Sequence, residues 1–311
     1  MNNKVLKTSI IMLILGFVLF LLGIQNGGLE YLKDTDIDSY RLGNSTKVNK
    51  YTMELDKITS TEVKFTKSNF KIKKSENGKN YIEYFSENEE DFKITNNEGK
   101  LLIEDLEEDS KFSFRININL NFVKNLLFND EISNNSFVLY LSESELENFN
   151  FNGFSSKVTI SDVNIRNIKI SQNAGNCDLK NINSENIELT NLAGNIDLNK
   201  VNNSNNFRSV SKAGNLYVED SKFNSCKVDK KAGNVSFSNV EINELLEVEN
   251  NAGNVNCSLF YDENVNYDVD LDSDVGNIYI DKDFNKNREE SKTVKIRLKS
   301  KAGNIKLKKI N

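Results

Sequence analysis

Histidine, proline and tryptophan are all absent from this 311-residue chain, and cysteine is scarce. Without histidine the chain cannot form a Ser-His-Asp triad, a histidine-ligated zinc site or an imidazole acid–base pair. Its three cysteines include no Cys-x-x-Cys pair, and this odd number predicts neither a disulfide framework nor a metal site. The net charge of -6 argues against a nucleic-acid partner, whose binding would need a basic face.

The clearest targeting signal is an uncharged apolar run at residues 8–24, TSIIMLILGFVLFLLGI. At about 1.5 Å per residue, a helix of this length measures roughly 25 Å, near the short end of what spans a bilayer. Lys4 and Lys7 precede the run and no positive cluster follows it, which places the N-terminus in the cytoplasm. A cleaved signal peptide is the alternative, but no clean small-x-small cleavage site follows. The sequence therefore predicts a single-pass protein of the cell membrane with an extracytoplasmic C-terminal domain.

The remaining chain shows the period of strands rather than of helices. Apolar and polar residues alternate in KFSFRININLNF at residues 111–122. Asn77-Gly78 lies between two apolar runs and predicts a hairpin, and a further turn is expected around Gly99. We predict five segments: a cytoplasmic tail at 1–7, a transmembrane anchor at 8–24, a tether at 25–50, an N-terminal β cap at 51–149 and a solenoid at 150–311.

A repeated Gly-Asn motif, usually preceded by alanine, organises the C-terminal half. Its glycines are Gly175, Gly194, Gly214, Gly233, Gly253, Gly276 and Gly303. Their successive spacings are 19, 20, 19, 20, 23 and 27 residues, and a period near 20 is typical of a solenoid. Apolar residues recur two and four positions after each glycine, and with one serine five and seven positions before it. Each unit is therefore predicted to be two short strands joined at a glycine corner.

Such a short strand pair cannot bury its apolar face alone, so it must stack on the next unit as one rung of a continuous core. Rungs about 4.8 Å apart would place equivalent residues above one another. Glycine permits the bend at each corner, and stacked asparagines can bond along the ladder. The three cysteines occupy core positions in this frame and are predicted to be buried, inert thiols. The fold class is therefore all-β, a β-solenoid of the right-handed β-helix type.

Charged residues outside the predicted core offer three features. The residues six positions before the glycines mostly alternate in sign and are predicted to form a surface ladder: Lys169, Glu188, Arg208, Lys227, Glu247, Asp270 and Arg297. A weak candidate for a calcium site is the row Asp268, Asp270, Asp272 and Asp274. The basic C-terminal end either shields an exposed sheet edge or contacts anionic wall polymer or lipid: Lys301, Lys306, Lys308 and Lys309.

The chain resembles the putative adhesin domain family of bacterial envelope proteins. The resemblance is carried by TEVKFTKSNFKIKKS, by GKLLIED and by the repeated AGN-apolar-x-apolar unit, and it covers most of residues 50–311. It implies a β-helix-like domain displayed outside the membrane, with no catalytic motif. The chain is also similar to proteins encoded beside envelope-stress regulators, which implies an envelope role.

These observations predict a non-enzymatic envelope or surface protein that needs no cofactor, an adhesin-like binding module or one related to envelope stress. Its expected partners are the membrane and either a cell-wall polymer or an envelope protein. Two alternatives are kept open, a polysaccharide-active β-helix enzyme and a structural spacer, although solenoid shape alone is only an analogy for catalysis.

Overall fold

A computed structural model describes residues 49–86, 89–105, 136–142, 145–285 and 292–310. The predicted cytoplasmic tail, the anchor at 8–24, nearly all of the tether and the alternating segment at 111–122 lie outside the described residues. Within the described ranges, no helix has both the length and the apolar character needed to cross a membrane.

The described chain consists of strands with two short 3-10 helices, which confirms the all-β prediction for this part of the protein. The strands before the central coils are β1 (Asn49–Leu55), β2 (Ser60–Phe65), β3 (Asn69–Lys74), β4 (Asn80–Ser86), β5 (Phe92–Asn97), β6 (Lys100–Asp105), β7 (Ser136–Leu141) and β8 (Glu145–Ser155). The later strands are β9 (Val158–Ala174), β10 (Cys177–Ala193), β11 (Ile196–Ala213), β12 (Leu216–Glu219), β13 (Lys222–Ala232), β14 (Val235–Ala252), β15 (Val255–Phe260), β16 (Asn266–Val275), β17 (Ile278–Ile280), β18 (Thr293–Ala302) and β19 (Ile305–Ile310). The 3-10 helices are η2 (Glu89–Asp91) and η3 (Lys282–Asn285).

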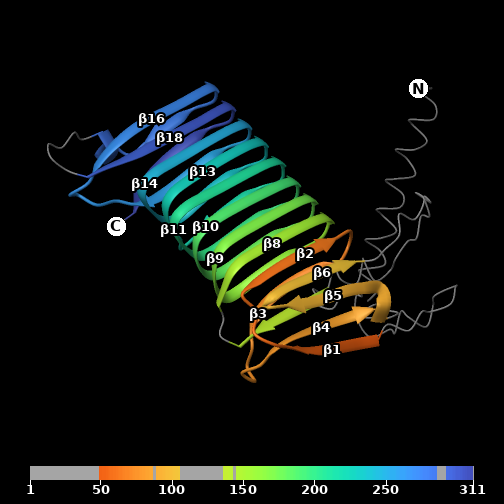
Figure 1. The fold of residues 1–311 in the computed structure, drawn as a ribbon. Helices are drawn as coiled ribbons and strands as arrows, with labels where there is room; N and C mark the ends of the chain where they lie inside the picture. Colours follow the sequence, from red (N-terminus) through yellow and green to blue (C-terminus); the bar gives the residue numbers. More distant parts are fainter. Residues whose placement is uncertain (1–48, 87–88, 106–135, 143–144, 286–291, 311) are drawn as a thin grey trace, which may run out of the picture. The chain divides into compact units, whose positions relative to one another are not determined.

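The central strands form stacked coils that pair in parallel register (Figure 1). Each coil has a first leg after one glycine corner, a bend, and a second leg before the next corner. In β10 and β11, Cys177 pairs with Ile196 before the bend and Ile187 pairs with Phe207 after it. The coils therefore repeat at the sequence period, as a solenoid requires. Strand β8 spans the predicted boundary between cap and solenoid, and that boundary stays a prediction.

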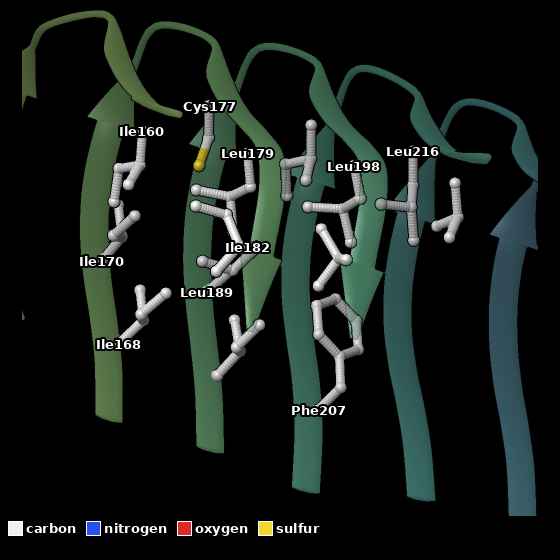
Figure 2. Close-up of a cluster of buried hydrophobic side chains, with 14 of the residues drawn as sticks. Ile160, Ile168, Ile170, Cys177, Leu179, Ile182, Leu189, Leu198, Phe207 and Leu216 are labelled. Atoms are coloured by element: carbon white, nitrogen blue, oxygen red, sulfur yellow. The ribbon is translucent and has the colours of Figure 1, made fainter. Parts of the chain in front are cut away.

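The core is the line of apolar side chains that the sequence frame predicts. Leu179, Leu189 and Leu198 point into the space between the two legs and are almost fully buried (Figure 2). Such stacking removes apolar surface from water in every coil, at about 25 cal/mol per Å². The rung around Gly276, formed by β16 and β17, is the exception, because its apolar side chains are partly or fully exposed: Val269, Leu271, Ile278 and Ile280.

That exception arises because the last two coils stack out of sequence order. Strand β18 pairs with β14 on one side and with β16 on the other, and β19 likewise lies between β15 and β17. The final rung in the sequence is thus inserted beneath the preceding one (Figure 1). The edge-shield explanation of the basic C-terminal run is therefore wrong for Lys301 and Lys306, because β16 and β17 form the outer rung beside them. It stays a prediction for Lys308 and Lys309, which lie beyond the three residues that β17 pairs.

The inserted order places opposite charges beside one another. In register, Arg297 of β18 lies between Glu247 of β14 and Asp270 of β16. Sequential stacking would have placed the aspartates of β16 directly against the glutamates of β14, and like charges opposite each other destabilise a strand pair. The inserted order makes this end of the surface ladder alternate in sign, which strict sequence order does not.

The first coils also stack out of order. Strand β2 lies between β6 and β8, and β3 lies between β7 and β9. Strands β5 and β6 form an antiparallel hairpin whose turn contains Gly99, as predicted. The predicted hairpin at Asn77-Gly78 is wrong: the turn forms, but β7 separates β3 from β4. A turn motif fixes local geometry but does not choose the long-range partner of each strand.

Candidate functional site

The glycine corners are architectural positions. All seven have positive φ, from +110° to +157°. A Cβ atom on Gly214 would lie 2.0 Å from the carbonyl oxygen of Gly194 in the neighbouring coil, which leaves no room for a side chain. The asparagine after each glycine continues the ladder: Asn195, for example, donates its backbone N–H to Asn176 Oδ1 at 2.9 Å. This bond joins a backbone N–H to a side-chain oxygen and does not link two side-chain amides. The asparagine oxygens at the corners therefore have partners inside the protein.

The cysteines are buried in the core, as predicted. Burial raises the pKa of the Cys177, Cys226 and Cys257 thiols above the ordinary value. The thiolate is the form that reacts or binds metal, so these groups are poorly suited to either role.

The repeat pattern did not predict that one ionisable residue, Lys230, is buried in the core. Lys230 lies three positions before Gly233, points inward and is 1% exposed. Its Nζ donates a hydrogen bond to Ser211 Oγ at 2.8 Å in the preceding coil. Burial lowers the pKa of Lys230 to about 8. The only sequence signal was a lysine at a position occupied by asparagine or serine in neighbouring coils, such as Asn191 and Ser211.

The aspartates of β16 lie beside basic residues of the neighbouring strand β18. Asp268 accepts a charge-assisted hydrogen bond from Arg297, which lowers the pKa of that carboxyl. Asp270 and Asp272 pair in register with Arg297 and Lys299. The described residues contain no group of three or more acidic, cysteine or histidine side chains that could hold a metal. The row therefore lies on one strand without converging on a common point.

A groove that we call the bend groove lies on the bends between the two legs of successive coils. It has a volume of about 450 Å³ and crosses β8, β9, β10 and β11, with the segment between β1 and β2 at one end. Its polar lining includes the equivalent asparagines Asn164, Asn183 and Asn202 of three consecutive coils. Ser184 and Ser204 add hydroxyl groups from β10 and β11.

The asparagines of the bend form hydrogen-bonded amide columns. Asn183 Nδ2 donates to Asn164 Oδ1 at 2.8 Å, and Asn202 Nδ2 donates to Asn183 Oδ1 at 3.2 Å. A second column beside the groove is bonded in the same direction and contains Asn148, Asn167, Asn186 and Asn205. Asn183 and Asn186, in the middle of their columns, each keep one N–H and one oxygen lone pair beyond these bonds. The chain of bonds also fixes which way each amide faces.

The bend groove carries charges of both signs. Lys57 and Arg166 are its cations, and Arg166 pairs with Glu185 across neighbouring coils at 3.4 Å. Glu145 and Glu147 line the end nearest β8. Two cations against three carboxylates leave the lining slightly acidic, so a polyanion would not be favoured there.

The period of the glycines does not predict this groove. The signal was present eight positions after two of them: Asn183 follows Gly175, and Asn202 follows Gly194. The coils of 20 residues accommodate their extra residue as a register shift at this bend, between Asn203 and Asn206 in β11. The irregular spacing of the glycines therefore marked the bend that shapes the groove.

Comparison with known proteins identifies the family of the chain and several similar solved structures. A "putative cell adhesion protein" of Clostridium sporogenes is 10% identical with a TM-score of 0.30, covering 85% of this chain and 100% of its own. A "putative adhesin" of Bacteroides fragilis is 10% identical with a TM-score of 0.43, covering 85% and 98%. A "putative lipid binding protein" of Parabacteroides distasonis is 14% identical with a TM-score of 0.39, covering 86% and 98%. None of the curated proteins compared with the chain matches it. The model of one family, Toastrack DUF4097, matches residues 58–310, and the chain belongs to that family.

Proposed function

We propose that this chain is a non-enzymatic, membrane-anchored envelope protein that binds a polyhydroxylated cell-wall polymer in the bend groove. The predicted anchor at residues 8–24 holds a right-handed coil outside the membrane. The observation that carries the proposal is the pair of asparagine columns at the bend, which offers the same donor and acceptor in successive coils.

The columns suit a repeating ligand for a geometric reason. Neighbouring coils are about 4.8 Å apart, a distance comparable with one sugar unit in an extended glycan. The inter-coil bonds hold the amides in place before any ligand arrives, so binding loses little side-chain entropy. A neutral or weakly charged glycan fits the slightly acidic lining better than a polyphosphate chain does.

The test is retention of the full chain, held in neutral detergent micelles, on purified cell-wall sacculi across a salt titration. We expect saturable retention that survives moderate salt, since the groove contacts are mostly hydrogen bonds. Asn183→Ala should weaken binding by roughly tenfold, because it removes ligand bonds from the middle of a column. Asn199→Ala is the matched control, because it removes one inter-coil amide bond, to Glu219, outside the groove.

The outcomes separate the three classes of function. Equal retention of both variants would refute the groove as the binding site. Release of sugar fragments over time would favour the polysaccharide-active enzyme instead. Absence of retention by the wild-type chain would overturn the proposal and favour a spacer or a protein-binding role.

A further inference from the structure

A second concave site, which we call the entry cleft, lies at the N-terminal end of the described coils. It has a volume of about 1050 Å³ and lies between β1 and β5. Strand β1 pairs with β4 and strand β5 pairs with β6, and within the described residues neither has a partner on its other side. Residues of both strands line the cleft.

The walls of the entry cleft are aromatic and apolar. Tyr51 and Met53 come from β1, and Phe92 and Ile94 come from β5. All four side chains are half-buried rather than buried. Tyr51 stacks on Tyr84 with ring centroids 5.2 Å apart, so part of this wall is held rigidly by the core.

Phe92 is fixed in the same way on the opposite wall. Its ring lies edge-on to the buried Phe137, with centroids 4.4 Å apart. Rings that are already immobilised offer apolar area to a ligand at little entropic cost.

The rim of the cleft is acidic. Helix η2 supplies three consecutive carboxylates, Glu89, Glu90 and Asp91, and no lysine or arginine is among the described residues that line the cleft. Asp91 accepts a hydrogen bond from Ser86, whereas the side chains of Glu89 and Glu90 are exposed. Burial and the nearby carboxylate of Glu89 raise the pKa of Tyr84, which agrees with a negative potential over the aromatic wall.

We propose that the entry cleft binds a cationic amphipathic peptide. The apolar face of the peptide covers Tyr51 and Phe92, and its lysine or arginine side chains reach Glu89 and Glu90. This is the helix-in-groove mode of recognition, with the charge of the rim selecting the sign of the ligand. The acidic rim opposes anionic lipid headgroups and acidic peptides. The site is separate from the bend groove and does not depend on glycan binding.

The absence of tryptophan makes the test direct. The probe is a synthetic amphipathic peptide of leucine and lysine with one tryptophan, a residue that the chain itself lacks. The full chain is held in phosphatidylcholine nanodiscs, and the signal from empty nanodiscs is subtracted. We expect saturable, one-to-one binding with a blue shift as the indole enters the cleft. The corresponding peptide of leucine and glutamate should bind at least tenfold more weakly.

Two double variants locate the binding. Glu89→Gln with Glu90→Gln should weaken peptide affinity by tenfold or more, with the thermal unfolding midpoint unchanged because both side chains are exposed. Glu244→Gln with Glu263→Gln removes the same charge from exposed positions of the C-terminal coils and should leave affinity intact. An equal loss in both variants would show only general charge attraction and overturn the proposal. Equal affinity for the two peptides, or no binding above empty nanodiscs, would overturn it as well.

Discussion

Replacing the buried Lys230 by methionine should stabilise the protein. Methionine keeps a long unbranched side chain in the core and removes an ammonium group that has one hydrogen bond there, to Ser211. Burial lowers the pKa of Lys230 from 10.5 to about 8. A difference of that size corresponds to roughly 3 kcal/mol of folding free energy, because each pKa unit is worth about 1.4 kcal/mol. Loss of the Ser211 bond offsets about 1 kcal/mol of the gain.

The sign of the pH dependence follows from proton linkage. Between pH 8 and 10.5 the folded chain has released the Lys230 proton while the unfolded chain still binds it. Unfolding then takes up a proton, so stability rises with pH across this window and is lowest below pH 8, where the buried group is charged. Lys230→Met should gain about 2 kcal/mol at pH 7, and its advantage should shrink as pH rises towards 9.5.

The assay is chemical denaturation followed by circular dichroism at several pH values from 7 to 9.5. Lys231→Met is the control, since it makes the same replacement at the exposed neighbouring position. An advantage of Lys230→Met that does not change with pH would refute the buried-charge explanation. Destabilisation of Lys230→Met at pH 7 would show that the hydrogen bond to Ser211 outweighs the cost of burying the charge.

Three further predictions test the coil architecture. Gly214→Val should lower the free energy of unfolding by several kcal/mol, because its Cβ would meet the backbone of the adjacent coil. Gly78→Ala should lower it by only about 1 kcal/mol, because φ is positive there but nothing lies within 4 Å. Equal thermal midpoints of the two variants would contradict the corner geometry. Arg297→Glu should lower the unfolding midpoint through repulsion from Asp268, with a smaller loss at high salt, and Asp268→Arg in the same chain should restore part of it. The three cysteines should resist a thiol reagent in the native protein and react fully in denaturant, whereas rapid native labelling would place them outside the core.

The rung order at both ends has a consequence for folding. The outer C-terminal rung, β16 and β17, can pair fully only when β18 and β19 have entered beneath it. The connections into and out of that outer rung are longer than the corners between central coils, which accounts for the glycine spacings of 23 and 27 residues. The two long spacings therefore reflect the insertion of the last rung between two earlier ones.

The sequence by itself determined the architecture of a single coil. Its period-two alternation and its glycine corners are local properties, so they identified Leu179, Leu189 and Leu198 as core residues. Buried positions are set mainly by which face of a strand a residue occupies, and that face follows from spacing alone. The same spacing placed the cysteines in the core.

Only the tertiary structure decided which strands become neighbours. Strand pairing is a long-range choice, and here it depends on charges such as Arg297 that gain partners on two sides when β18 is inserted. The exposed Ile278, the separation of β3 from β4 and the bend groove all result from that choice, and none of them follows from local period. The sequence carried the amides and charges of both candidate sites, but stacking the coils brought residues from separate strands into one groove and one cleft.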